Sequence, residues 1–280
     1  MSYVIISDSS SDLITHTAEN YSCVPLKIIT DNKEYVDDAD LNLGEMIEDL
    51  KKYKGKSRSS CPNAEDWLSA MQGYDTVFCV TITSGLSGSN NTANIALKEY
   101  LDENPDAKGY VVDSLSAGPE VALLVEKLAT LLGEGLDFET AKTKIEEYKA
   151  TTHLTFCLES LRNLANNGRV SGAVAKIAGI LGIRIVGVAS LEDTLEVCEK
   201  ARGAEKALSS LIKNIESNGY CGGRMRIHHC RALGNANAVA DRIRERYPDA
   251  EIIMHETGAL CSFYAEEGGL LIGYEGAKKY

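Results

Sequence analysis

Short apolar runs alternate with amphipathic stretches through the first half of the chain. The runs at residues 4–6, 76–80 and 109–113 predict buried strands, because each is short and bounded by polar residues. In the stretches after them, apolar side chains recur with helical spacing, which indicates amphipathic helices. Strands that alternate with helices favour a parallel α/β sheet. The helices predicted in this half span residues 12–20, 43–53, 64–71, 93–101, 119–132 and 138–149.

Two further segments interrupt this alternation. Residues 24–30 predict another strand, which turns at Asp31 and Asn32 into a short partner at residues 34–36 and so forms a hairpin. Residues 56–63 predict a polar loop, and its Pro62 is well placed to start the next helix.

The pattern changes near Ala150 into one typical of an α+β domain with a mixed sheet. A helix of small residues is expected at 173–181, followed by a hairpin of two strands at 183–189 and 194–198. We therefore predict two domains, residues 1–150 and 151–280. The remaining strands and helices of the second domain are expected at residues 153–158, 204–217, 225–229, 235–247 and 251–255.

The segment between the strand at 76–80 and the next helix contains the most informative loop. Ser84, Ser87 and Ser89 supply hydroxyl groups there, while Gly85 and Gly88 allow a ligand to approach the backbone closely. The N–H groups at the start of the following helix have no helical partner, so this loop could bind a phosphate or a carboxylate. An ordinary turn with a serine cap is the alternative interpretation. The loop matches neither a dinucleotide-binding motif nor a P-loop.

Other polar loops follow the predicted strands at Asp8, Ser57 and Asp113. In parallel sheets, ligands bind beside the carboxyl ends of the strands, so we expect these loops to gather around the serine-rich one. Asp8 itself is better explained as a residue that orders its turn or caps a helix than as a ligand.

The composition excludes several classes of protein. The chain has 280 residues, of which 44% are hydrophobic and 25% charged, as in ordinary globular proteins. Its net charge of −12 argues against a nucleic-acid partner and against docking on anionic lipid surfaces. No apolar run has transmembrane length, and no signal peptide is recognisable. The eight cysteines form no C-x-x-C pair, which indicates a reducing cytoplasm without disulfides.

No catalytic or metal-binding set is legible in the sequence. His228 and His229 are adjacent in a predicted strand, so their side chains point to opposite faces and cannot share a metal ion. His255 ends a strand and is better explained as structural. Arg169 could bridge the two domains, meet a partner or form a structural ion pair. We therefore predict no catalytic residue and no metal ligand.

Several short motifs occur in a fixed order along nearly the whole chain and resemble those of the DegV family. Each motif alone is a weak signal, but the ordered set is fairly specific. The matching pieces are DSSSDL at 8–13, SGLSGS at 84–89, VDS at 112–114, NGRVS at 167–171 and LGIR at 181–184.

Members of the DegV family bind a long-chain fatty acid between two α/β domains. Many bacterial members present the acid to a separate fatty acid kinase, which phosphorylates the acyl carboxylate. The resemblance therefore implies a cytoplasmic carrier protein that is not an enzyme, has no ATP site and needs no cofactor beyond the bound fatty acid.

The resemblance also implies roles for particular residues. The family's carboxylate contacts fall on Ser59, Ser60 and Ser87, and the arginine implicated in phosphoryl transfer with the kinase matches Arg202. Three stretches depart from the family pattern. Residues 116–120 read SAGPE instead of S-x-G-x-G. Residues 59–63 read SSCPN instead of T-S-Q-P-S, which places Asn63 at the last position. Residues 264–268 read YAEEG instead of H-x-G-P-G, which places Tyr264 near the pocket.

The predicted head-group site combines these assignments with the serine-rich loop. We expect the Ser87 hydroxyl and the N–H groups of Gly88 and Ser89 to bind one carboxylate oxygen. Ser59 or Ser60 would donate to the second oxygen, and the predicted ligand-binding set also includes Ser84 and Tyr264. A phosphotransferase or hydrolase that acts on a small phosphorylated or hydroxylated substrate at the same loops is the alternative function, because a phosphate would suit this seat equally well.

Overall fold

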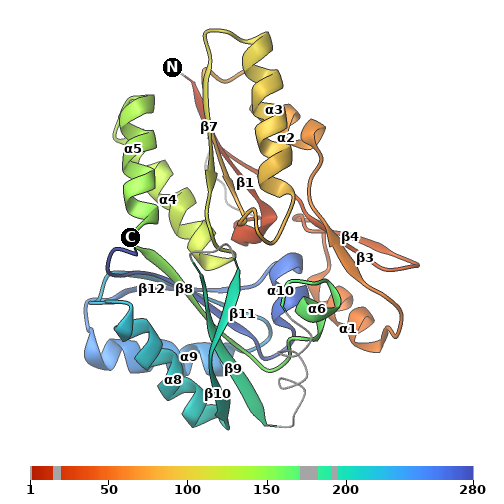
Figure 1. Ribbon diagram of the computed structural model, residues 1–280, viewed down its shortest axis with the longest axis vertical. Helices are drawn as coiled ribbons and strands as arrows, with labels where there is room; N and C mark the ends of the chain where they lie inside the picture. The colour runs from red at the N-terminus through yellow and green to blue at the C-terminus, as the bar shows by residue number, and fades with distance from the viewer. Residues whose placement is uncertain (1, 15–19, 171–181, 191–193, 280) are drawn as a thin grey trace.

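The computed structural model describes residues 2–14, 20–170, 182–190 and 194–279. The helix expected at 173–181 lies outside the described residues, as does most of the one expected at 12–20. A 3₁₀ turn, η1 (Ser9–Ser11), follows the first strand and precedes the segment at 12–20. Figure 1 shows the parallel sheet with its helices at one end of the molecule and a larger mixed sheet at the other.

Four parallel strands form the first sheet. Their order is β2 (Tyr21–Val24), β1 (Tyr3–Asp8), β6 (Thr76–Thr81) and β7 (Lys108–Asp113). Because successive side chains of a strand point to opposite faces, Val4 and Ile6 of β1 pack beneath one helical layer and Ile5 beneath the other. The two layers are α2 (Ala64–Met71) with α3 (Ser89–Glu103), and α4 (Pro119–Gly133) with α5 (Phe138–Lys149) (Figure 1). The predicted parallel α/β sheet is thereby confirmed.

A small antiparallel sheet projects from this layer. It contains β4 (Glu34–Val36), β3 (Lys27–Ile29) and β5 (Arg58–Ser60), and α1 (Leu43–Lys52) connects β4 to β5. The hairpin of β3 and β4 was predicted, but a single strand over 24–30 was wrong. Pro25 has no N–H to donate, so β2 ends at Val24 and β3 begins in a different sheet. The predicted loop at 56–63 likewise contains β5, which pairs with β3.

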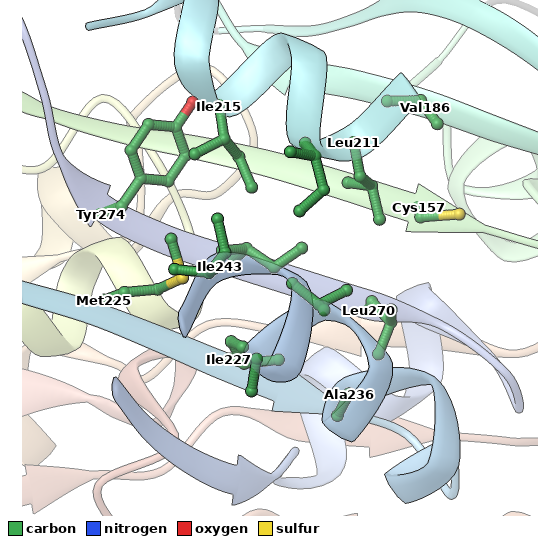
Figure 2. Packing of buried hydrophobic residues seen from close by; sticks show 14 of the residues in the cluster. Cys157, Val186, Leu211, Ile215, Met225, Ile227, Ala236, Ile243, Leu270 and Tyr274 are labelled. Atoms are coloured by element: carbon green, nitrogen blue, oxygen red, sulfur yellow. The ribbon is translucent and has the colours of Figure 1, made fainter. Parts of the chain in front are cut away.

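A mixed sheet of six strands dominates the second half. Its order is β10 (Leu195–Arg202), β9 (Ile183–Ala189), β8 (Thr152–Leu158), β13 (Leu270–Glu275), β11 (Arg224–His229) and β12 (Glu251–Glu256). Only β11 and β12 run parallel among these neighbours. Two helices, α8 (Ala204–Ser217) and α9 (Leu233–Arg246), cover one face, and Figure 2 shows Leu211 and Ile243 of these helices packed against Ile227 and Leu270 of the sheet. The mixed sheet was predicted.

Two elements near the C-terminus were not predicted. The central strand β13 lies between β8 and β11, and helix α10 (Ala259–Ala265) packs beside the small sheet. Both elements are short and apolar, and glycines lie between them, so the sequence periodicity gives no clear signal. A further short helix, α6 (Arg162–Asn166), follows β8.

Helix α4 joins the two halves of the molecule. It contacts β1 and β6 of the parallel sheet and also β11 and β13 of the mixed sheet. The close approach requires Gly273 on β13, because a Cβ atom there would lie 2.6 Å from backbone atoms of Pro119 and Glu120. Glu126 on α4 forms a largely buried ion pair with Arg226 on β11. The strands of the first two sheets precede residue 150 and those of the third follow it, while the division into two domains there stays a prediction.

The N-terminus of α10 is held by carboxylates from the first half. Asp37 accepts hydrogen bonds from the N–H groups of Ala259 and Leu260 at 2.6 and 3.0 Å. Asp12 accepts one from the Gly258 N–H at 2.7 Å. Both carboxylates are buried, and burial raises the pKa of Asp37 to about 7. The position of α10 therefore depends on residues more than 200 positions away in the sequence.

Candidate functional site

An apolar pocket lies where the two halves meet. It contains about 640 Å³ of space free of protein atoms, part of which is open to solvent. Three consecutive inward-facing residues of β8 form part of its wall: Leu154, Phe156 and Leu158. Residues of the first half complete the wall, among them Leu26, Ile82 and Ala117.

Phe156 is the one phenylalanine among the described lining residues, and the neighbouring strands fix the position of its ring. It lies opposite Gly187 of β9, where a Cβ atom would come within 2.3 Å of the phenylalanine ring. The missing side chain at Gly187 therefore makes room for the ring on the neighbouring strand. On the other side, Phe156 is paired with Leu271 of β13, which also lines the pocket. The mixed sheet thus presents a continuous apolar surface to the pocket.

Among the described residues of this wall, four carry polar side chains: Ser59, Ser87, Arg169 and Tyr264. The hydroxyl oxygens of Ser59 and Tyr264 lie 2.6 Å apart in a hydrogen bond that joins β5 to α10. Burial raises the pKa of Tyr264, and the Ser59 hydrogen bond and the nearby Arg169 charge oppose that rise. The phenol therefore stays neutral near pH 7 and can donate a hydrogen bond.

Arg169 brings a positive charge to the pocket wall. Its Nε donates to the carbonyl oxygen of Leu86 at 3.1 Å, and Nη1 donates to the carbonyl of Asn167. Across the described ranges, no carboxylate lies within 4 Å of this half-buried guanidinium. From the sequence, Arg169 could bridge the two domains, contact a partner or form an ion pair. The residues around it give no signal that would identify it as a ligand-binding residue.

Ser87 lies in the loop between β6 and α3, as expected, and is half-buried in the pocket wall. Its hydroxyl oxygen accepts a hydrogen bond from the Ser89 N–H at 3.3 Å. This long hydrogen bond gives Ser87 a share in ordering the start of α3, which was the alternative interpretation of the loop. The hydroxyl hydrogen is still available to a ligand oxygen.

The remaining residues of the predicted head-group site do not line the pocket. Ser60 is adjacent to Ser59, but its hydroxyl donates to the carbonyl of Cys61 at 3.2 Å. Ser84 is exposed, and its N–H donates to the carboxylate of Asp113 at 3.2 Å. The Ser60 hydroxyl is therefore used by the neighbouring backbone, and the Ser84 N–H ties its loop to the end of β7.

Gly88 and Ser89 also lie outside the pocket lining. Gly88 is exposed, and a Cβ atom on it would lie 3.2 Å from Cys61 Sγ. Ser89 is fully buried and donates its hydroxyl to Asp8 Oδ2 at 2.6 Å. That oxygen also accepts the Ile82 N–H at 2.9 Å, and the other oxygen of Asp8 accepts from Ser10. Asp8 thus orders the loops after β1 and β6, as we expected of it.

Arg202 lies far along the mixed sheet. It is the last residue of β10, is exposed, and does not line the pocket, whereas Leu195 at the other end of the strand does. No acidic side chain of the described residues lies within 4 Å of it. Its guanidinium is accessible to another molecule.

The histidines have structural surroundings. His228 is fully buried, with its Nδ1 2.7 Å from Asp12 Oδ2, and burial lowers its pKa while the Asp12 contact opposes that change. His255 is exposed at the edge of the sheet. Within residues 2–14, 20–170, 182–190 and 194–279, no three His, Cys, Asp or Glu side chains are arranged to hold a metal ion. In the same ranges, no helix combines the length and apolar character that a membrane span requires.

Comparison with known proteins places this pocket in context. A family model described as an uncharacterised protein of the DegV family matches residues 2–276. A DegV domain-containing protein of Streptococcus gordonii is 42% identical over 281 residues, which cover 98% of this chain and 99% of the relative.

Two solved structures are similar in both sequence and fold. The Fatty Acid Kinase (Fak) B3 protein of Streptococcus pneumoniae, loaded with linoleic acid, is 42% identical with a TM-score of 0.97, and the match covers 99% of this chain and 100% of that one. A DegV family protein of Eubacterium eligens, loaded with heptadecanoic acid, is 40% identical with a TM-score of 0.96, over 98% and 100% of the two chains. The chain described here belongs to the DegV family.

Proposed function

We propose that this protein binds a long-chain fatty acid in the pocket and presents its carboxylate to a separate fatty acid kinase. The observation that carries the proposal is an apolar pocket whose wall contains two serines, a neutral tyrosine and an arginine that has no carboxylate partner in the described part of the chain. The fatty acids in the relatives that are 40% and 42% identical support the same ligand class.

The apolar wall supplies most of the binding free energy. Each CH₂ group removed from water contributes about 0.8 kcal/mol, so a dozen contribute on the order of 10 kcal/mol before the cost of ordering the ligand. A small phosphorylated substrate would leave the apolar side chains of this wall uncovered. The pocket therefore favours an acyl chain over the phosphotransferase or hydrolase alternative.

Arg169, Ser59, Ser87 and Tyr264 would bind the carboxylate. A buried carboxylate is stable only when it is paired or hydrogen-bonded, and the Arg169 guanidinium offers charge-assisted hydrogen bonds. The two serines and the tyrosine can each donate a hydroxyl hydrogen. The wall residues would then hold the acyl chain, with Phe156 and Leu271 beneath it.

Presentation to a kinase requires a surface for that partner, and we assign Arg202 to it. The exposed guanidinium at the end of β10 is free for a contact with another protein or with a phosphoryl group. Substitution Arg202→Ala is expected to leave acid binding intact and slow acyl-phosphate formation. The matched control is Lys200→Ala, since Lys200 is exposed two positions earlier on the same strand. Loss of fatty-acid binding in Arg202→Ala would contradict the assignment of Arg202 to the kinase contact.

The remaining parts of the proposal follow from the same function. The protein would act in the cytoplasm, where ATP-dependent kinases work, and its eight cysteines are all free thiols. It would need no cofactor beyond the acid it carries. Its two domains would be residues 1–150 and 151–280, with the acid between them.

Native mass spectrometry of the freshly purified protein tests the function. We expect one acyl species per chain, and one added palmitic acid per chain after lipid removal. Substitution Leu271→Trp fills the pocket and should abolish retention, while the control Leu233→Trp changes an exposed leucine of α9 and should not. A protein that retains only a phosphorylated metabolite, or retains palmitic acid equally in both variants, would contradict the proposal.

A further inference from the structure

The apolar pocket extends along β8 away from the residues proposed to bind the carboxylate. Leu158 at one end of this wall belongs to the same apolar cluster as Leu164 and Tyr264. The carbonyl of Leu164 in turn accepts a hydrogen bond from the Arg169 N–H at 2.8 Å. Leu154 lies four residues before Leu158 and faces the same side, roughly 13 Å away at the usual rise of a strand. The end of the pocket that is farther from the head group is therefore at Leu154.

A buried polar group, which we call the polar layer, lies directly behind Leu154 and consists of Thr152, Glu120 and Lys279. Thr152 is the next residue of β8 on the same face as Leu154, and its hydroxyl donates to Glu120 Oε1 at 2.8 Å. The ammonium of Lys279 lies 2.7 Å from the same oxygen. Glu120 is fully buried, and its other oxygen, Oε2, has no hydrogen-bond partner within the described part of the chain.

Helix α4 places Glu120 against this end of the pocket. Gly273 of β13 pairs with Leu154, and a Cβ atom on that glycine would lie 2.6 Å from the Glu120 backbone nitrogen. The start of α4 therefore packs directly on the strand pair that contains Leu154. Ala117, just before the helix, lines the pocket, whereas Glu120 is not among the described lining residues. Glu120 also stands where the DegV pattern has glycine, so the family pattern does not account for the layer.

The segment after β13 covers the polar layer from the outside. The Gly276 N–H donates to the carbonyl of Thr151 at 2.7 Å, which holds the segment beside the start of β8. The Lys279 N–H donates to the carbonyl of Ala150 at 2.7 Å. A hollow that opens to solvent lies at this end of the mixed sheet, and both Leu154 and Lys279 line it. Leu154 and the polar layer thus separate the pocket from this hollow.

We propose that Leu154 and the polar layer set the maximum length of the acyl chain that this protein binds. The length limit rests on the proposed function and adds a specificity to it. Every CH₂ group that lies against the apolar wall strengthens binding. A CH₂ group beyond Leu154 would instead lie against Glu120 and Lys279, and to make room it would have to separate their buried charges, which is strongly unfavourable. Affinity should therefore stop rising with chain length once the methyl end reaches Leu154.

A polar end limits the chain more sharply than an apolar end would. Apolar side chains can repack around an additional CH₂ group at a modest cost, whereas a buried ion pair that is separated leaves each charge without a partner. Glu120 cannot readily compensate, because one of its oxygens already lacks a hydrogen-bond donor among the described residues. The alternative is that the contact between Glu120 and Lys279 only ties α4 to the segment after β13. It would then affect stability but not the chain length that is bound.

The affinities of the lipid-free protein for a series of saturated acids test the proposal. The probes run from lauric to behenic acid and include the odd-numbered chains. For the unaltered protein, we expect affinity to rise about fourfold with each CH₂ group up to one length and then to level off or fall. Substitution Leu154→Ala should move this limit by about two CH₂ groups, because it empties the last position of the wall. The limit is read within each variant's own series, so a general loss of affinity does not obscure it.

A matched control shows whether the effect belongs to this end of the pocket. Leu164→Ala removes the same atoms from a buried lining residue at the head-group end and should not move the limit. Leu154→Val is a milder truncation that should move the limit by about one CH₂ group, and it makes the same test if the alanine variant does not fold.

A triple variant tests the polar layer itself. It adds Glu120→Leu and Lys279→Met to Leu154→Ala, since apolar residues can often replace a buried ion pair without loss of stability. The Thr152 hydroxyl retains a partner in this variant, the carbonyl of Lys149 at 3.2 Å. The limit should move farther than in Leu154→Ala alone, because the chain would then meet apolar side chains behind the wall.

Each result supports or overturns the length limit. An unchanged limit in Leu154→Ala, or an equal shift in Leu164→Ala, would overturn it. Equal limits in Leu154→Ala and the triple variant, with a lower thermal midpoint in the triple variant, would assign the ion pair to stability alone. Affinity that rises steadily through behenic acid in the unaltered protein would overturn the limit while it supports the proposed function. A protein that binds none of the acids would contradict the proposed function itself, and the length limit with it.

Discussion

Two polar clusters lie where the halves of this protein meet, and they differ in how far their hydrogen-bonding capacity is used. In the first, Asp12 and Asp37 are buried and accept hydrogen bonds from the start of α10 and from His228. In the second, Arg169 has hydrogen bonds to two backbone carbonyls but no carboxylate partner among the described residues, and it opens onto an apolar pocket. A polar cluster whose hydrogen-bond partners all belong to the protein stabilises the fold. A cluster with hydrogen-bond donors still free can bind a ligand.

Removal of Asp37 should have the largest effect, and the effect should be on stability. Asp37→Ala leaves the N–H groups of Ala259 and Leu260 without acceptors in a buried place, which costs about 3 kcal/mol of unfolding free energy. Urea unfolding measures it, with the exposed Asp40→Ala as the control. A loss no greater than in the control would show that the first cluster does not hold α10.

Removal of the Arg169 charge should have the opposite pattern. Arg169→Met is expected to weaken palmitic acid binding roughly ten- to a hundredfold and to leave the thermal midpoint nearly unchanged. Affinity for the matched long-chain alcohol, which carries no charge, should change little. Isothermal titration with both ligands checks this. Equal losses for acid and alcohol would mean that Arg169 shapes the pocket instead of pairing with a carboxylate.

Ser87 both lines the pocket and helps to order the start of α3, so its substitution can separate a ligand-binding role from a structural one. Ser87→Ala should weaken palmitic acid binding about tenfold, which corresponds to one charge-assisted hydrogen bond. Because the bond from the Ser89 N–H is long, the thermal midpoint should fall only slightly. Affinity and midpoint are measured on the same variant. A large fall in midpoint with unchanged affinity would identify Ser87 as part of the helix cap alone.

The pH dependence of stability should show a smaller effect, which comes from Asp37 of the first cluster. The folded-state pKa of Asp37, about 7, lies above its ordinary value of 3.8, so the folded chain binds more protons than the unfolded one between these values. Stability from this group is therefore complete below about pH 4 and is lost as the pH rises toward 7. Between pH 5 and 6 the loss should be about 1 kcal/mol. Asp37→Asn should remove that part of the slope, and an unchanged slope would exclude Asp37 as its source.

The sequence predicts the parallel sheet well because its short apolar strands alternate with amphipathic helices, a periodic signal that is legible locally although β1 and β6 pair across more than 70 residues. It fails at 24–30, where Pro25 divides the apolar run between two sheets. It also fails at α10 and β13, whose formation depends on pairing with distant strands and on caps from Asp12 and Asp37. Those contacts leave no periodic signal in residues 259–275.

The predicted head-group residues divide for a similar reason. Ser59, Ser87 and Tyr264 line the pocket, whereas the hydroxyls of Ser60 and Ser89 donate to Cys61 and Asp8. The serines look alike in the sequence, because the face on which each one lies is decided by the pairing of β5 and by the packing of the loop before α3. Arg169 could not be identified as a ligand-binding residue from the sequence either, because the absence of a carboxylate partner among the described residues is visible only in three dimensions.

A crystal structure of the protein with palmitic acid tests the central claim most directly. The account predicts an acyl chain over Phe156 and Leu271, with its carboxylate within hydrogen-bond distance of Arg169 and of at least one of Ser59, Ser87 and Tyr264. A carboxylate at the opposite end of the pocket, or an acid bound outside it, would contradict the account.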